Sequence, residues 1–538
     1  MFPTSRSPAS RQLVCNIGHA RARTIASSLG PAVASISYHH VSHLTSPVRR
    51  ADGVGRTYST RLIHSSTNRP KPTNHLTINN ASSLSATDEP QPSEMPKTPS
   101  PLAVLPLTNV LRSWMTTTVS SSPFLLPPSL SVMSVLAHTT NPVLNPDRNP
   151  ILRAFLKKTF YAQFCAGENP AEVRQTIDSL KQIGFSGVIL GYAREVVLTD
   201  SETKDLASCA AEGGAAAEEC IRTEINPWAE GTMETVRLAS PGDFVALKFT
   251  GAGRQALYSL SKRLPPSEAL GSAIDGICKL AAERGVRLLF DAEQTALQPG
   301  IDDWTLDYMR RYNKVGKAVV HGTYQGYLKS TPSTLSKHLA IAAAEGFTLG
   351  VKLVRGAYLG SDPRELICDT KADTDNQYDG IAESLLRKSW SGLLQPPTPH
   401  KEETKFPDVN VVLATHNRDS VLKGKALLDS GVAKLGYKQV AFAQLQGMAD
   451  EVSCELVAGP HESPKEMEMG EVAEKSEEKV HKPQVYKYLV WGSTGECMKY
   501  LLRRAYENRD AVQRTRSGRE AMGREVGRRV RGLFGLSS

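Results

Sequence analysis

Two adjacent arginines near the C-terminus, Arg503 and Arg504, have residue types and surroundings suited to binding a small carboxylic acid. They lie in residues 488–507, which read as a strand, a loop bounded by glycines and then a helix. On such a helix both arginines share one face with Tyr500 and Glu507, because these four positions have offsets of 0, 3, 4 and 7. Guanidinium groups offer fixed paired donors and stay charged, so they match a planar carboxylate. For an isolated match, the alternative is a solvent-exposed ion pair between Arg503 and Glu507.

A binding site at these arginines requires a fold that places other side chains close to them. From about residue 151, short apolar segments alternate with amphipathic ones, as in 171–183, 333–345 and 419–428. Eight strands are expected, at 187–190, 244–250, 286–292, 318–324, 350–355, 409–415, 439–445 and 486–491. Eight β/α units predict the α/β class and a closed parallel (β/α)8 TIM-like barrel. The chemistry of such a barrel is expected at the C-terminal ends of its strands.

Polar side chains recur at the predicted strand ends. They are Lys248, Asp291, Glu293, Gln325, Lys352, Arg355, Tyr358, Thr415, His416, Asn417, Gln444 and Tyr488. Any one of them alone reads as a core residue with a satisfied partner. Their recurrence at seven successive strands favours a functional pit instead, because a barrel brings those ends together.

Several other site types are disfavoured. The sequence contains no GxGxxG after a strand, no GxxxxGK, no HExxH and no GxSxG, and its eight cysteines are scattered without ligand spacing. A Rossmann or P-loop nucleotide site, a metal centre and a serine hydrolase are therefore not expected. No apolar run is long enough to span a bilayer. The excess of positive charge lies at the two ends of the chain, which disfavours a nucleic-acid-binding body.

The ends and interruptions of the barrel pattern define the expected domains. Residues 1–70 hold nine arginines and one acidic residue, which is typical of a mitochondrial transit peptide; we assign it to residues 1–60, with cleavage between Tyr58 and Ser59. Residues 61–150 are expected to form a linker and a poorly defined region, and 151–510 the barrel. Segments 199–231, 391–407 and 459–483 read as surface insertions. The basic tail, 511–538, suits either an anionic membrane surface or a solvated, partly helical tail.

The motifs LLFDAEQT, GTYQGYLK, VKLVRGAY, DTKADTDNQY, LATHN, AFAQLQGM and YLLRRAYEN resemble the mitochondrial proline dehydrogenase family, most closely its fungal form. The resemblance implies a distorted barrel that holds FAD over the strand ends, with the last helix over the substrate. It implies oxidation of L-proline to Δ1-pyrroline-5-carboxylate by hydride transfer to flavin N5. Ubiquinone is the implied electron acceptor, reached by peripheral contact with the matrix side of the inner mitochondrial membrane.

The resemblance also implies individual roles. Arg503 and Arg504 would bind the proline carboxylate, and Glu195 would pair with the first arginine and gate the site. The residues implied around the proline ring are Lys248, Asp291, Tyr358, Tyr488 and Tyr500. Those implied to contact FAD are Gln325, Lys352, Val354, Gly356, Thr370, Lys371, Thr415, His416, Asn417, Gln444, Arg504 and Glu507. The chain departs from the family at Lys352, where relatives often have arginine, and at Leu359, where some have tryptophan.

Other interpretations stay open at this point. A hydroxyproline dehydrogenase would share almost every motif, and an inactive relative would act as a mitochondrial binding protein. A flavin barrel of the methylenetetrahydrofolate reductase type shares the fold class but leaves the paired arginines unexplained. Lys352 would equally suit an ion pair with a nearby carboxylate, and His416 a hydrogen bond to the backbone.

Overall fold

Eight parallel strands form a closed barrel in the computed structural model, which describes residues 100–194, 206–209, 214–396, 405–459, 482–507 and 512–535. The strands are β1 (Gly187–Tyr192), β2 (Phe244–Leu247), β3 (Arg287–Phe290), β4 (Val320–Gln325), β5 (Leu349–Val354), β6 (Val409–Ala414), β7 (Val440–Leu445) and β8 (Gln484–Trp491). β8 closes the barrel by pairing with β1 as well as β7. The strands are apolar and buried almost throughout, as expected of a sheet covered on both faces. The predicted barrel and all eight predicted strands are confirmed.

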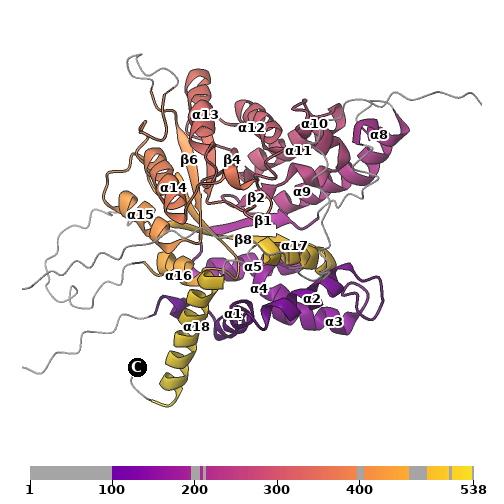
Figure 1. Ribbon diagram of the computed structural model, residues 1–538, viewed down its shortest axis with the longest axis vertical. Helices are drawn as coiled ribbons and strands as arrows, with labels where there is room; N and C mark the ends of the chain where they lie inside the picture. The colour runs from indigo at the N-terminus through magenta and orange to yellow at the C-terminus, as the bar shows by residue number, and fades with distance from the viewer. Residues whose placement is uncertain are drawn as a thin grey trace, which may run out of the picture. The chain divides into compact units, whose positions relative to one another are not determined.

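Helices surround the barrel (Figure 1). Those that follow the strands or precede β1 are α5 (Pro170–Ile183), α9 (Asn226–Leu238), α10 (Arg254–Ser261), α11 (Glu268–Arg284), α12 (Gln298–Tyr312), α13 (Thr331–Glu345), α14 (Lys371–Leu386), α15 (Arg418–Asp429), α16 (Asp450–Ala458) and α17 (Thr494–Glu507). Shorter helices are α3 (Pro150–Leu156), α4 (Ala162–Phe164), α7 (Leu206–Cys209) and α8 (Ala215–Cys220). The three predicted helices match α5, α13 and α15. Gly184 ends α5 in the left-handed conformation, at φ +114°, which glycine adopts without steric cost.

The predicted insertion at 199–231 is wrong in its C-terminal part. Residues 226–231 form the start of α9, where Trp228 and Ala229 are buried in the main hydrophobic core. Because α9 follows β1 and precedes β2, it is the first helix of the barrel wall rather than a surface addition. The Ala- and Glu-rich composition that suggested an insertion is equally that of a helix.

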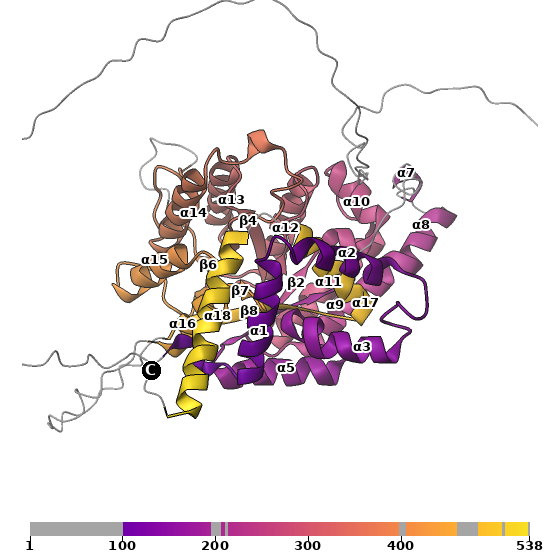
Figure 2. The same ribbon diagram turned by 60° about the horizontal axis from the view of Figure 1, so that its bottom comes forward.

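The poorly defined region before the barrel and the solvated basic tail are also corrected, whereas residues 61–99, the part read as a linker, lie outside the described residues. The region before the barrel contains α1 (Leu107–Ser120) and α2 (Leu126–His138), and the tail contains α18 (Val512–Leu533). α18 lies beside α1 in both views (Figures 1 and 2), and Met522 and Val110 are buried in one cluster. Arg529 Nη2 donates to the carbonyl oxygens of Leu102 and Leu105, at 3.1 and 2.8 Å. The first described residues and α1 are therefore packed against α18, the last described helix.

Some predictions fall outside the described residues: the transit peptide, Glu195, and most of the insertion at 459–483. The surface insertion predicted at 391–407 is described except for residues 397–404, and it is wrong at Leu394 and Phe406, which are buried in the main hydrophobic core. Among the helices that the structure describes, none combines the length and apolar character needed to cross a bilayer.

Candidate active site

A buried ion pair lies at the mouth of the barrel. Lys352 of β5 places Nζ 2.6 Å from Oδ1 of Asp291, the residue directly after β3, and both are at most 7% exposed. Tyr488 of β8 donates from Oη to Asp291 Oδ2 at 3.3 Å. Burial, and then the charge of Asp291, raises the pKa of Tyr488 well above its usual value. Asp291 and Tyr488 were expected around the proline ring and Lys352 against the cofactor, and the structure joins all three by an ion pair and a hydrogen bond. The alternative reading of Lys352, as a lysine bound to a carboxylate, is confirmed.

Helix α17 brings a second group of site residues over this ion pair. Arg504 Nε donates to the hydroxyl of Tyr500 at 3.3 Å, and the ammonium of Lys248 lies 5.5 Å from the centre of the Tyr500 ring. Tyr500 is buried, which raises its pKa, and Arg503 and Arg504 are only partly exposed. The two arginines are therefore held beside the pit rather than directed into bulk water.

The opposite face of α17 explains this placement. Met498 and Leu502 are buried and pack with Leu130 of α2 in one apolar cluster. The helical spacing predicted for residues 488–507 is confirmed, because the apolar face of α17 is buried and its arginines fall on the other side.

A small cavity of about 30 Å³, partly open to solvent, lies between β1, β2, β8, α9 and α17. Its walls include Gly191, Trp228, Ala246, Lys248, Tyr488 and Tyr500. Trp228 is a wall residue that sequence reasoning does not single out, because it falls in the segment read as an insertion. Its indole Nε1 donates to the backbone oxygen of Lys248 at 3.1 Å, which fixes the end of β2. The signal that was available is Pro227 before it, a residue favoured in the first turn of a helix.

Two further residues near the strand ends, Glu293 and Tyr358, join neighbouring segments by hydrogen bonds. Glu293 accepts a hydrogen bond from the backbone N–H of Thr250 at 3.1 Å and also contacts the Thr250 hydroxyl. Burial raises the pKa of Glu293, while the charge of Lys248 opposes that rise. Tyr358 donates from its hydroxyl to the backbone oxygen of Ala292 at 3.1 Å, which ties the loop after β5 to the end of β3.

Gln325 and Gly356 form a cradle at the ends of β4 and β5. Gln325 Oε1 accepts from the backbone N–H of Ala357 at 3.1 Å, while its buried Nε2 has no hydrogen-bond partner among the described residues. Gly356 has φ +157°, and a Cβ there would lie 2.5 Å from the Tyr327 ring. A buried donor of this kind is costly unless something accepts from it. The cradle therefore fits a bound polar group such as the expected cofactor, close to Val354 at the end of β5.

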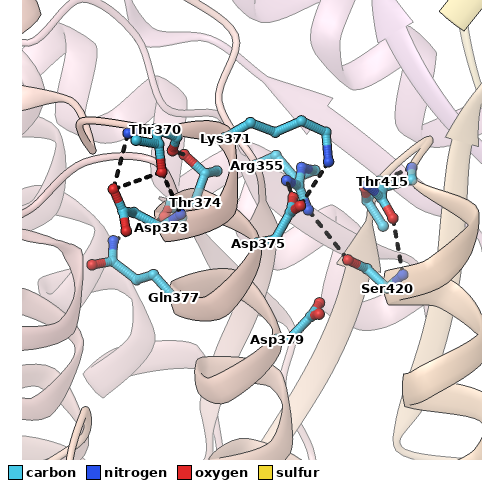
Figure 3. Close-up of polar contacts among 12 residues, drawn as sticks. Arg355, Thr370, Lys371, Asp373, Thr374, Asp375, Gln377, Asp379, Thr415 and Ser420 are labelled. Carbon is cyan, nitrogen blue, oxygen red and sulfur yellow. Dashed lines mark hydrogen bonds and ion pairs between the residues drawn. The ribbon is translucent and has the colours of Figure 1, made fainter. Parts of the chain in front are cut away.

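The start of α14 carries two more of the expected cofactor residues (Figure 3). Thr370 and Asp373 form a capping box: the Thr370 hydroxyl accepts from the Asp373 N–H at 3.1 Å, and Asp373 accepts from the Thr370 N–H at 3.0 Å. Lys371 is exposed and lies 2.6 Å from Asp375, which also contacts Arg355. A helix start with a cationic side chain suits an anionic group.

The ends of β6 and β7 are joined by side-chain hydrogen bonds. Gln444 donates from Nε2 to the Thr415 backbone oxygen at 3.2 Å and accepts at Oε1 from Ser453 at 3.0 Å. His416 accepts at Nε2 from the Leu445 N–H at 3.1 Å. The predicted hydrogen bond between His416 and the backbone is therefore confirmed at Nε2. The neutral ring then carries its proton on Nδ1. Asn417 accepts from the Ser420 N–H and begins α15. The side chains of Glu195 and Glu507 lie outside the described residues.

Comparison with known proteins matches this chain to one family. A family model described as proline dehydrogenase matches residues 173–517. A probable mitochondrial proline dehydrogenase of Schizosaccharomyces pombe is 29% identical over 472 residues, which cover 79% of this chain and 89% of that protein. A hydroxyproline dehydrogenase of Xenopus laevis is 28% identical over 70% of this chain and 78% of its own length.

The fold has a counterpart among solved structures. Proline utilization A from Bdellovibrio bacteriovorus has a TM-score of 0.51 at 15% identity; the match covers 77% of this chain and 39% of that one, and it shows the fold alone. The family model spans more than half of the sequence and includes both the barrel and helix α17. The chain therefore belongs to the proline dehydrogenase family.

Proposed function

We propose that the protein catalyses the FAD-dependent oxidation of L-proline to Δ1-pyrroline-5-carboxylate and passes the electrons to ubiquinone, as the first step of proline catabolism to glutamate. The observation that carries the proposal is the cavity between the barrel mouth and α17, lined by Lys248, Tyr488 and Tyr500 with Arg504 bonded to Tyr500. A cationic clamp beside two buried phenol rings suits a small ring that bears a carboxylate.

Each part of the substrate has a matching group. Arg503 and Arg504 bind the carboxylate, and the Tyr488 and Tyr500 rings pack against the apolar ring carbons. Asp291 is held by Lys352 and Tyr488, so its position at the floor of the site is fixed before substrate arrives.

The cofactor would be held by the cradle at Gln325 and Gly356, by the start of α14 at Thr370 and Lys371, and by the remaining residues that the family resemblance implies. FAD, when bound, supplies the acceptor for the hydride that leaves the proline ring. The unmatched Nε2 of Gln325 supports this assignment, because a bound acceptor would satisfy it.

Lys248 has a separate expected role. The ring nitrogen of proline must be neutral so that its lone pair can form the C=N bond as hydride leaves. A nearby cation disfavours the ammonium form and so lowers the pKa of the bound amine. Lys248→Met should therefore shift the pH profile of anaerobic flavin reduction upward by about one unit. The exposed residue Lys499, replaced by methionine, is the control; an unaltered profile in Lys248→Met would exclude Lys248 from this step.

The proposed reaction has a direct test. Purified protein should be yellow, and anaerobic L-proline should bleach its flavin absorbance. Bleaching by hydroxyproline alone would favour the second candidate, hydroxyproline dehydrogenase, which is supported by relatives of that name at nearly the same identity as those named proline dehydrogenase. A colourless protein that binds no FAD would contradict both and favour a binding protein.

The location proposed for the enzyme is the mitochondrion, with peripheral contact to the matrix side of the inner membrane. Relatives named mitochondrial and the arginine-rich composition of residues 1–60 support it. Processing between Tyr58 and Ser59 would appear as a new N-terminus in protein isolated from mitochondria.

A further inference from the structure

Three helices outside the barrel, α1, α2 and α3, carry exposed apolar side chains. On α1 the exposed residues are Leu107, Leu111, Trp114, Met115 and Val119, which are spaced as neighbours on one helix face. On α2 Val132 and Val135 are exposed, and on α3 Ile151 and Phe155. Phe124, between α1 and α2, is 87% exposed. Single exposed apolar residues are ordinary, but a run of this length on adjacent helices marks an interaction surface.

The segment that carries α1 and α2 has almost no charged side chains, whereas α3 adds the exposed cation Arg153. Residues 101–146 contain one charged side chain, Arg112, and no acidic residue. Arg112 itself is turned toward the protein, where it donates to Gln163 at 3.1 Å and Asn109 at 3.0 Å. The exposed sides of α1 and α2 therefore combine large apolar side chains with neutral polar ones such as Thr108 and Ser131, and carry no acidic group.

A cationic helix borders this face. The sequence of α18 holds seven arginines and two glutamates. Glu525 is buried and binds Arg528 and Arg529, whereas Arg516, Arg524 and Arg531 are exposed. Figure 2 shows α18 and α1 side by side at the front of the molecule, with α2 next to α1. Leu533 and Phe534, at the end of α18, add apolar groups that are 81% and 75% exposed.

We propose that the exposed sides of α1, α2, α3 and α18 form a docking surface for an anionic lipid bilayer. Apolar side chains beside arginines suit the boundary between acyl chains and acidic headgroups, where each residue type meets its preferred partner. A second copy of the chain fits less well, because a symmetric contact through this face would bring the arginines of both copies into one interface. Residues 71–100 contain only four large aliphatic side chains, Leu76, Ile78, Leu84 and Met95, too few to cover the face.

The position of this surface links it to the active site. On one side of α2, Leu130 packs against Met498 and Leu502 of helix α17. Val132 and Val135 of α2 are exposed. One helix, about 10 Å across, therefore separates a docked bilayer from the helix that bears the arginine clamp. Docking here would hold the site beside a lipid-soluble electron acceptor. This inference rests on the proposed membrane contact and assigns it to named elements.

Vesicle flotation tests the assignment. The full-length protein should float with phosphatidylcholine vesicles that contain cardiolipin, and less with phosphatidylcholine alone. The triple variant Met115→Ser/Val132→Ser/Ile151→Ser, with one change on each helix, should lower the bound fraction at least about tenfold. The double variant Arg524→Gln/Arg531→Gln should lose binding to the cardiolipin vesicles only, because it removes charge and not apolar area.

The matched control replaces three exposed apolar residues elsewhere: Leu264→Ser/Val315→Ser/Val432→Ser. It should bind vesicles like the parent protein, and all variants should retain flavin reduction by proline. Equal flotation of the two triple variants would overturn the inference, as would a change from dimer to monomer in the first triple variant without loss of vesicle binding. Flotation needs no substrate, so a failure of proline to bleach the flavin would bear on the proposed function alone.

Discussion

Replacing Arg504 by methionine is expected to raise the KM for proline by about 30-fold. A charge-assisted hydrogen bond to a carboxylate contributes about 2 kcal/mol, and each 1.4 kcal/mol corresponds to a factor of ten in affinity. The structure adds a second consequence, because Arg504 also donates to the hydroxyl of Tyr500. Loss of that bond frees the ring that lies under the ammonium of Lys248. Steady-state kinetics with an artificial acceptor, supported by proline titration of the oxidised flavin, measure the effect.

Lys499→Met is the matched control for this prediction. Lys499 is a cation on the same helix, α17, but its side chain is exposed. The control should leave KM unchanged, which separates loss of the carboxylate contact from a general loss of positive charge near the site. If Arg504→Met kept the parental KM and lowered only kcat, the arginine would act in the chemical step and not in substrate binding.

The barrel was predictable because its signals are local and repeated. Eight apolar segments, seven of them with polar ends, and intervening amphipathic helices predict the closed sheet and the side of it that carries the site. The faces of α17 were equally readable, because Met498 and Leu502 repeat at helical spacing opposite the two arginines.

What was not predictable depends on contacts between distant residues. The insertion predicted at 199–231 is wrong for α9 because the burial of Trp228 is decided by β1 and β2, not by the Ala- and Glu-rich composition around it. The docking of α18 depends on Arg529 and Met522 meeting residues near position 102, more than four hundred positions earlier. Likewise, the partner of Lys352 could not be named, because Asp291 is one of several strand-end carboxylates and the pairing is set by the barrel.

That pairing gives the second large prediction, which concerns stability. Removing the carboxylate in Asp291→Leu leaves the ammonium of Lys352 buried, at 7% exposure, without its ion-pair partner. Breaking a buried pair from one side costs about 3–5 kcal/mol, because the remaining group either stays charged in an apolar setting or gives up its proton. Tyr488 loses its acceptor as well. Both Asp291→Leu and Lys352→Met should therefore unfold at clearly lower urea concentration than the parent protein, and Asp291→Leu should lose proline oxidation.

The double variant Asp291→Leu/Lys352→Met separates the ion pair from the role proposed for Asp291 in the substrate site. With both charges gone, neither group is left buried alone, so the unfolding midpoint should return most of the way to the parental value. Activity should not return, because Asp291 no longer forms the floor of the substrate site. If the two single losses of stability simply added in the double variant, Lys352 and Asp291 would not be coupled, and the 2.6 Å contact would have no energetic role. If activity returned with stability, Asp291 would act only as the partner of Lys352 and would have no direct part in the reaction.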